Sequence, residues 1–237
     1  MLFIGYSNKD RYAIVEPILF HLKHFGLDVW YDFQDMFLGD DRYQTNFVHG
    51  IGSSAYIIFI ISPNLFDSTC AMQELAFAKT LIEDGHAVFF PIFYHFSPDK
   101  LPKGLCWINN IIYNEVKSDS GSRHVAYQIV ERVFRDDQLT LPYQSLEIFL
   151  QNQCFRNDYI VRLLTSWANV DERSYGMRIG ILYSLYQYLP RIETKYNKAI
   201  EYIFSLLQMN EKPDHLIYSI FEKCIIGYCS CQLTDCQ

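Results

Sequence analysis

The segment that most constrains the fold is a run of six apolar or aromatic residues, Tyr56 to Ile61, which contains no charged side chain. A strand of this composition is typical of parallel sheets that are covered on both faces. The first part of the chain repeats the pattern, because short apolar runs alternate with segments whose apolar residues recur at helical spacing. The expected strands are residues 2–6, 27–31, 56–61, 87–93 and 111–113, and the expected helices are residues 11–24, 43–51, 68–83 and 123–135. We therefore predict an α/β fold, a flavodoxin-like open sheet of five parallel strands.

The pattern changes near residue 143. From there to the end of the chain, apolar residues recur only at helical spacing, and Pro190 and Pro213 interrupt the segment. We expect four or five helices and no strands, with the repeated Tyr and Leu residues forming a core. The sequence thus divides into an α/β domain, residues 1–137, and an all-α helical domain, residues 138–237.

Charge and hydropathy argue against two classes of partner. The chain has 20 Lys and Arg residues against 27 Asp and Glu residues, a formal net charge of −7, which disfavours a protein that binds nucleic acid through its bulk charge. The first apolar run, Leu2 to Ile4, has no basic segment before it, and no apolar run is long enough to span a bilayer. We therefore expect a cytoplasmic protein that binds neither nucleic acid nor a membrane.

Seven cysteines in a cytoplasmic protein are expected to be free thiols. Four of them gather near the end of the chain, namely Cys224, Cys229, Cys231 and Cys236. Their spacing lacks the C-x2-C pairs of common zinc sites, so we favour a structural role over metal binding. We expect no metal site.

One glutamate follows the apolar strand in the octet Ser68-Thr69-Cys70-Ala71-Met72-Gln73-Glu74-Leu75. A carboxylate near the start of the helix after a strand lies where open α/β sheets bind ligands, outside the carboxyl ends of their strands. The alternative is a solvated glutamate in the first turns of the helix, where the helix dipole favours negative charge. Position alone leaves both interpretations of Glu74 open.

Several motifs resemble the TIR (Toll/interleukin-1 receptor) domain family, and they occur in the family's order. Residues 3–10, Phe-Ile-Gly-Tyr-Ser-Asn-Lys-Asp, are similar to the opening F-I-S-Y-S-x-x-D. Residues 29–32, Val-Trp-Tyr-Asp, followed by Gly39, resemble the second strand and the BB loop. Residues 52–54 and 61–64 fit I-x-x-S and I-S-P-x-Y/F, and residues 68–75 fit S-x-W-C-x-x-E-L. Residues 1–137 are therefore identified as a TIR domain.

The resemblance implies two kinds of function. Many TIR domains, especially in bacteria, cleave NAD+ at the nicotinamide–ribose bond, and in that branch the glutamate of the last motif is catalytic, which here is Glu74. Nicotinamide leaves as a neutral molecule and needs no general acid, so one carboxylate that stabilises an oxocarbenium-like ribose is enough. NAD+ is then the substrate, and no cofactor is expected. Other TIR domains are scaffolds that associate with further TIR domains.

The resemblance also implies residues that contact the substrate. Tyr6 and Ser7, at the end of the first strand, are expected to border the pocket, with strand-end packing as the alternative. Asp32 matches an acidic pocket residue of the family, with a simple loop-start aspartate as the alternative. Phe33 and Phe37 lie in the BB loop, where they would stack on nicotinamide or adenine or pack on a neighbouring subunit.

The chain departs from the family pattern at two positions of the last motif. Cys70 stands where the family usually has Trp, and Ala71 replaces the usual Cys. We still expect Cys70 to border the substrate, while the aromatic platform would come from Phe33 or Phe37. The departure puts substrate affinity and product type in doubt but keeps the carboxylate of Glu74.

The helical part carries no recognisable effector signal. A TIR domain without its own effector resembles the signal-producing subunit of Thoeris-like antiphage systems, which makes a cyclic or conjugated ADP-ribose derivative for a separate effector protein. We expect the same activity here, in a homo-oligomer held by TIR–TIR contacts. The alternatives are a non-enzymatic adaptor that acts by TIR–TIR association, an NAD-depleting effector, and a microbial effector that interferes with host TIR signalling.

Overall fold

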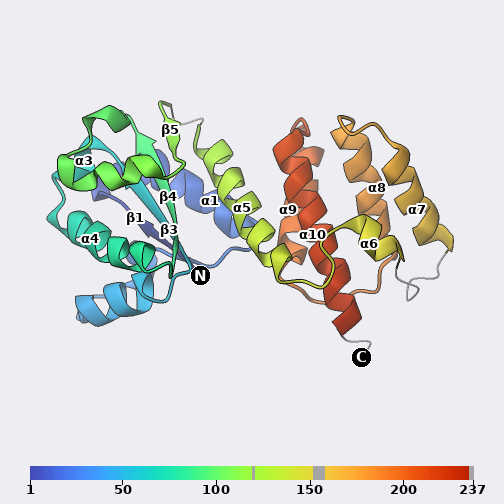
Figure 1. Cartoon of the computed structure of the whole chain (residues 1–237), viewed down its shortest axis with the longest axis horizontal. Helices are drawn as coiled ribbons and strands as arrows, with labels where there is room; N and C mark the ends of the chain where they lie inside the picture. The colour runs from blue at the N-terminus through green and yellow to red at the C-terminus, as the bar shows by residue number, and fades with distance from the viewer. Residues whose placement is uncertain (119–120, 152–157, 235–237) are drawn as a thin grey trace. The chain divides into compact units, whose positions relative to one another are not determined.

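In the part of the chain that the structure describes, a sheet of five parallel strands organises the first half (Figure 1). The strands are β1 (Leu2–Gly5), β2 (Val29–Trp30), β3 (Tyr56–Ile61), β4 (Val88–Tyr94) and β5 (Asn114–Val116), in the spatial order β2-β1-β3-β4-β5. In the register, Leu2 lies opposite both Val29 and Tyr56, and Tyr56 lies opposite Val88. This computed structural model describes residues 1–118, 121–151 and 158–234. It confirms the predicted α/β fold with a five-stranded parallel sheet.

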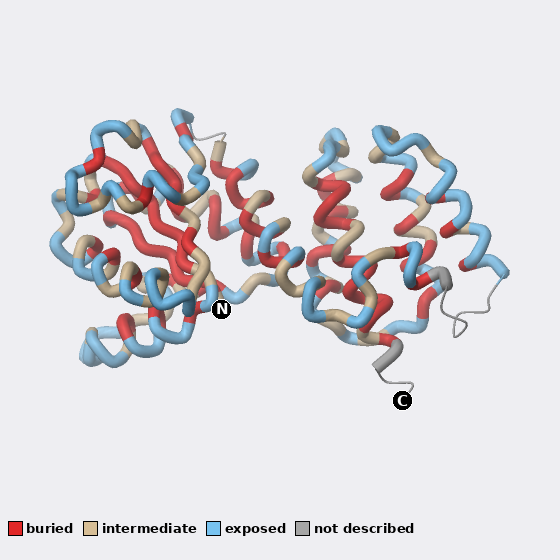
Figure 2. Tube along the Cα trace, viewed as in Figure 1, coloured by how far each residue is buried: buried red, intermediate tan, exposed pale blue. Residues whose placement is uncertain are grey.

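The sheet is covered on both faces, as the apolar run predicts. Ile57 and Phe59 belong to a core cluster that also includes residues of the segments after β3 and β4, whereas Ile58 and Ile60 point to the opposite face and are equally buried. Figure 1 shows α4 (Thr69–Glu83) on one side of the sheet and α1 (Glu16–His24) on the other. Figure 2 shows the strands as the most continuously buried part of this unit.

The segments between the strands begin and end at residues suited to helix termini. Before α1 come η1 (Asn8–Asp10) and the π-helix η2 (Arg11–Val15), and Gly26 follows α1 with a φ of +80°, a value that favours glycine. The side-chain oxygen of Ser68 accepts a hydrogen bond from the backbone N–H of Ala71 at 3.3 Å, which caps α4. The remaining segments are α2 (Asp32–Asp35), η3 (Tyr43–Ile51), α3 (Pro63–Phe66), η4 (Pro98–Lys100) and η5 (Lys103–Asn110).

The predicted fifth strand at residues 111–113 is wrong by three residues. The backbone N–H of Ile111 donates to the carbonyl of Ile108 at 3.0 Å, so Ile111 closes the helical turn of η5 and does not begin a strand. Ile112 is fully exposed, at 97 %, and pairing with β4 starts only at Asn114. The apolar composition of residues 111–113 thus suggested a buried strand, although the side chain of Ile112 points to solvent.

The described residues pack as two units. One consists of residues 1–23 and 27–126, and the other of residues 24–26 and those from Tyr127 onward. The helix α5 (Gly121–Leu139) begins in the first unit and ends in the second. We keep the division into residues 1–137 and 138–237 as a proposal, and below we use "sheet unit" and "helical unit" for the two observed units.

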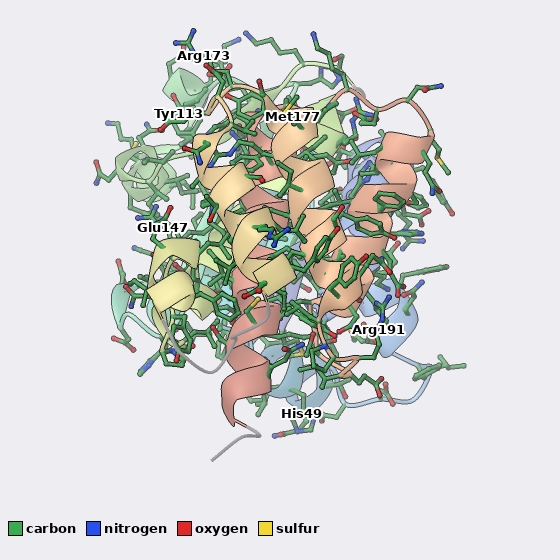
Figure 3. The ribbon with its side chains drawn as sticks, turned by 90° about the vertical axis from the view of Figure 1, so that its right-hand side faces the viewer. His49, Tyr113, Glu147, Arg173, Met177 and Arg191 are labelled. Carbon is green, nitrogen blue, oxygen red and sulfur yellow. The ribbon has the colours of Figure 1, made fainter. Side chains whose placement is uncertain are left out.

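Among the described residues, the helical unit contains five further helices: α6 (Leu146–Gln151), α7 (Asp158–Asn169), α8 (Tyr175–Tyr188), α9 (Asn197–Gln208) and α10 (His215–Thr234). They confirm the predicted all-α region. Helix α10 packs against α8 and α9, and Gly227 allows this close approach, since a Cβ atom there would lie 2.3 Å from the ring of Tyr196. Figure 3 looks onto these helices and labels Met177, which is 62 % exposed on α8.

The cysteines near the end of the chain contribute to the core of the helical unit. Cys224 and Cys229 are fully buried on α10, and burial raises the pKa of both thiols. Cys231 is half-buried, and Cys236 lies outside the described residues. Within the described ranges, no three His, Cys, Asp or Glu side chains are placed to hold a metal ion. None of the described helices combines the length and hydrophobicity that a bilayer-spanning segment needs.

Candidate active site

Glu74 lies in the second turn of α4, the helix that follows β3 and the short α3. Ala71 and Leu75 on the same helix are buried against the sheet. Their packing fixes the orientation of the helix and holds the Glu74 side chain at its edge, where only 12 % of that side chain is exposed. Glu74 is therefore a largely buried carboxylate and not the solvated one that the alternative interpretation describes.

Two side chains contact the same oxygen of Glu74. The Nδ2 atom of Asn46 donates a hydrogen bond to Oε1 at 2.7 Å, and the Nη2 atom of Arg42 lies 3.7 Å from Oε1. Arg42 is anchored in turn on α4, because its guanidinium donates to the Gln73 side chain at 2.9 Å and to the Cys70 carbonyl at 3.3 Å. The loop before η3 is thereby tied to the helix that carries the carboxylate.

The environment raises the pKa of Glu74 to about 7. Burial is the largest cause, and the negative charge of Asp32 adds to it. The positive charge of Arg42 and the hydrogen bond from Asn46 oppose the rise without cancelling it. Glu74 therefore changes its charge near neutral pH, a property common among catalytic carboxyl groups and also found in structural networks.

Asp32 is held beside the site by two donors to one oxygen. The Tyr6 hydroxyl donates to Oδ1 at 2.6 Å, and the backbone N–H of Phe33 donates to the same atom at 2.7 Å. Tyr6 is buried and packs against Tyr31 at 5.9 Å between ring centroids, and burial together with Asp32 raises the pKa of its hydroxyl. The structure thus brings together Tyr6, Asp32 and Glu74.

No hydrogen bond or ion pair described in this structure links the other residues singled out in the sequence to Glu74. Ser7 is buried after β1, and no hydrogen bond described for its side chain reaches the carboxylate. Phe33 is 59 % exposed beneath the guanidinium of Arg11, which lies 4.0 Å from its ring centre. Phe37 is 74 % exposed on the loop before η3. Cys70 is exposed, and its carbonyl contacts Arg42.

Part of the opening sequence motif has a structural role. Both oxygens of Asp10 accept hydrogen bonds, Oδ2 from the Ser62 hydroxyl at 2.5 Å and Oδ1 from the Asn64 amide at 2.6 Å. Asp10 is buried and thereby joins the segment after β1 to the segment after β3. This tie fixes the carboxyl ends of the two central strands against each other.

Sequence reasoning missed the residues that contact Glu74 directly. Arg42 follows two aspartates in a loop, and nothing in its sequence surroundings distinguishes it. Asn46 carried a usable signal, because it interrupts the apolar face formed by Phe47, Gly50 and Ile51 and yet is only 1 % exposed. A buried amide in such a position needs partners, and the fold supplies them.

Comparison with known proteins gives low-identity matches to bacterial TIR proteins. The chain is 28 % identical over 99 residues to 2' cyclic ADP-D-ribose synthase BtTIR of Bacteroides thetaiotaomicron, covering 42 % of this chain and 34 % of that protein. It is 26 % identical over 102 residues to NAD(+) hydrolase TcpC of Escherichia coli O6:H1, covering 43 % and 33 %. The chain thus spans about a third of the length of these curated relatives.

A solved TIR domain, that of the Toll-related receptor TRR-2 of Hydra magnipapillata, aligns with a TM-score of 0.44 at 20 % identity, over 57 % of this chain and 95 % of that one. The sequence profile of the TIR domain family matches residues 2–127, which is more than half of the 237 residues. The chain therefore belongs to the TIR domain family.

Proposed function

We propose that the sheet unit cleaves NAD+ at the nicotinamide–ribose bond, as a hydrolase of N-glycosyl bonds or as an ADP-ribosyl cyclase. The observation that carries the proposal is the largely buried carboxylate of Glu74 beside Asp32, with its pKa raised to about 7. The names of the two bacterial relatives, a cyclic ADP-ribose synthase and an NAD(+) hydrolase, support it.

The chemistry needs negative charge more than it needs proton transfer. The bond between C1 of the ribose and the pyridinium nitrogen breaks, its electron pair goes to nicotinamide, and positive charge develops on the ribose. The negative charges of the Glu74 and Asp32 carboxylates stabilise this positive charge, in a site that is largely shielded from water. Water then adds to C1 and releases a proton, giving ADP-ribose, whereas an adenine nitrogen or a ribose hydroxyl of the same molecule gives a cyclic product.

We assign substrate contacts to the residues around this pair. Tyr6, Ser7 and Cys70 would border the ribose and nicotinamide. The exposed rings of Phe33 and Phe37 would stack on a base or pack on a neighbouring subunit, so that a homo-oligomer with TIR–TIR contacts completes the site.

The product and its use follow from the expected biological setting. We propose that the protein acts in the cytoplasm and makes a cyclic or conjugated ADP-ribose derivative in antiphage defence. This diffusible nucleotide would act on a separate effector, as in Thoeris-like systems. An NAD-depleting effector is the alternative outcome of the same chemistry, and product analysis separates the two.

A second candidate is a non-enzymatic adaptor that works through TIR–TIR association. Cys70 in place of the family's Trp favours it, as does the exposure of Phe37 and of its neighbour Leu38. An adaptor would keep its cellular function when Glu74 is replaced, whereas the enzyme would lose it.

The deciding experiment is NAD+ consumption by the purified full chain, concentrated or crowded to favour assembly, with products resolved by mass spectrometry. Glu74→Gln is compared with Glu83→Gln, the same change at an exposed position near the end of α4. Turnover that is lost only in Glu74→Gln supports the enzyme. Absence of turnover in the concentrated protein and in phage-infected cell lysate would refute it in favour of the adaptor.

A further inference from the structure

The buried amide of Asn46 joins two parts of the sheet unit. Its Oδ1 atom accepts a hydrogen bond from the indole Nε1 of Trp30 at 3.1 Å, and its Nδ2 atom donates to Glu74 Oε1 at 2.7 Å. The three residues come from β2, η3 and α4. A hydrogen-bonded chain thus runs from the second strand to the candidate catalytic carboxylate.

Trp30 fixes which way the amide points. An indole N–H can only donate, so the atom of Asn46 that it meets must be the carbonyl oxygen. The amide NH2 group then faces Glu74, and this group can only donate. Since an ionised carboxylate accepts hydrogen bonds and a protonated oxygen would offer another donor, this orientation of Asn46 favours the ionised form of Glu74.

The position of Trp30 is itself fixed by packing. A Cβ atom built on Gly50 would lie 2.6 Å from the indole nitrogen, so only glycine leaves room for the ring beside η3. Asn46 and Gly50 are four residues apart on the same segment. One side of η3 therefore receives the ring at Gly50 and binds its N–H at Asn46.

The contacts also orient the carboxyl group of Glu74. Asn46 and Arg42 both meet Oε1, and no side chain in the described ranges donates a hydrogen bond to Oε2. That second oxygen remains available to a substrate hydroxyl. One oxygen is held by the protein while the other can serve the reaction.

We propose that Asn46, oriented by Trp30, is a positioning residue that favours the ionised form of Glu74 by donating to Oε1, which leaves Oε2 for the substrate. The proposal deepens the NAD+-cleaving function above and rests on it. Burial and Asp32 both disfavour the charged carboxylate, and Asn46 acts against them.

The test removes the two hydrogen-bond donors of the Trp30–Asn46–Glu74 network one at a time and measures the pKa of Glu74. Asn46→Leu removes the amide at nearly constant size, and Trp30→Phe removes the indole N–H at a position that does not touch the carboxylate. Both should raise the pKa of Glu74, by about one unit for Asn46→Leu, as expected for a lost hydrogen bond to the charged form. The pKa is read from the ¹³C carboxyl resonance in glutamate-labelled full-length protein, assigned with Glu74→Gln.

The pH profile of NAD+ turnover is the second readout. Its acidic limb should move upward with the pKa of Glu74, and Asn46→Leu should recover to within about threefold of the wild-type rate once the pH exceeds the new pKa by a unit or more. His49→Ala, at an exposed position of the same segment (labelled in Figure 3), should change neither readout. Circular dichroism checks that each variant is folded.

Two results would overturn the proposal. One is an unchanged pKa of Glu74 in folded Trp30→Phe and Asn46→Leu proteins, and the other is a rate that falls equally at all pH values. If the wild type consumes no NAD+, the proposed function fails, but the resonance of Glu74 still decides whether Asn46 controls its ionisation.

Discussion

The two units of the chain each contain a partly buried glutamate whose pKa is raised chiefly by burial, Glu74 in the sheet unit and Glu222 in the helical unit. Each glutamate belongs to a network that includes an arginine and a tryptophan N–H. The networks differ in how far their arginine is exposed to solvent, and this difference separates a candidate site from a structural one.

The helical network is centred on one hydroxyl. The Tyr218 oxygen accepts from Trp167 Nε1 at 3.2 Å and from Arg178 Nε at 3.0 Å, and it donates to Glu222 at 2.9 Å. Arg178 is only 8 % exposed and also donates to the Val170 carbonyl at 3.1 Å. Such a network stabilises the packing of α7, α8 and α10 and leaves its members little freedom to act on a ligand.

The sheet network remains open at one end. The Arg42 side chain is 40 % exposed, and its Nη2 atom lies 3.7 Å from Oε1 of Glu74. A raised pKa alone therefore does not identify an active site. A raised pKa together with a partly solvent-exposed arginine beside the carboxyl group is a sharper criterion.

The largest expected effect separates the two glutamates by activity. Glu74→Gln should reduce NAD+ turnover by about 10³-fold, because it removes the charge that stabilises the transition state. Glu222→Gln should stay within about twofold of wild type, since it changes a network that meets no substrate. Steady-state assays on both folded variants measure this, and equal losses would erase the functional distinction between the networks.

The next effect separates the two arginines by stability. Arg178→Met should destabilise the helical unit by about 3 kcal/mol, because it leaves the hydroxyl of Tyr218 and the carboxyl of Glu222 without their buried cation. Arg42→Met should cost less than about 1 kcal/mol, because Arg42 is partly solvated. Hydrogen–deuterium exchange of peptides from α8 and α4 reports the two local stabilities. A comparable loss in both variants would contradict the comparison.

The pH dependence of stability sharpens the view of Glu74. Its pKa rises from an ordinary 4.5 to about 7, so ionisation opposes folding. Below pH 4.5 Glu74 is largely protonated in both the folded and the unfolded state, so it does not lower the free energy of unfolding. The destabilisation grows as the pH rises from 4.5 toward 7 and then stays constant, at about 3 kcal/mol at most. Glu74→Gln should therefore be more stable than wild type at pH 8, and the difference should disappear near pH 4.5. Thermal unfolding at both pH values measures it.

The smallest effect concerns the rate of the wild-type protein. Because Glu74 acts as a carboxylate and its pKa is about 7, NAD+ turnover should fall about tenfold between pH 8 and pH 6. A profile that is flat over this range would mean that substrate binding or another step hides the ionisation. Presteady-state measurements of nicotinamide release would distinguish these cases.

The sequence predicted those features that depend on local pattern. The apolar run of β3 predicted that strand, and the helical spacing of apolar residues within 11–24 and 68–83 predicted helical segments there, because each pattern depends on neighbours in sequence. The fifth strand was misplaced because Ile111 closes a turn, a contact that apolar composition does not reveal.

The candidate site was predictable only at its centre. Glu74 stood out because a motif of eight residues surrounds it. Its partners Arg42 and Asn46, and the Trp30 that orients Asn46, are 28 to 44 positions away, and only the folded sheet assembles this network. Long-range contacts of this kind have no signature in a single sequence, apart from the unexpected polarity of Asn46 on a buried face.

The burial of two thiols in α10 gives the helical unit a built-in chemical reporter. Alkylating reagents attack thiolates, and Cys224 and Cys229 are both buried and hard to ionise, whereas Cys70 and Cys106 are exposed. Mass spectrometry of alkylated peptides would measure the labelling rate of the two buried thiols relative to that of the exposed ones. This ratio reports the fraction of time that α10 is locally unfolded. Any ligand or partner that loosens the helical unit would register as faster modification of these two cysteines, without any introduced probe.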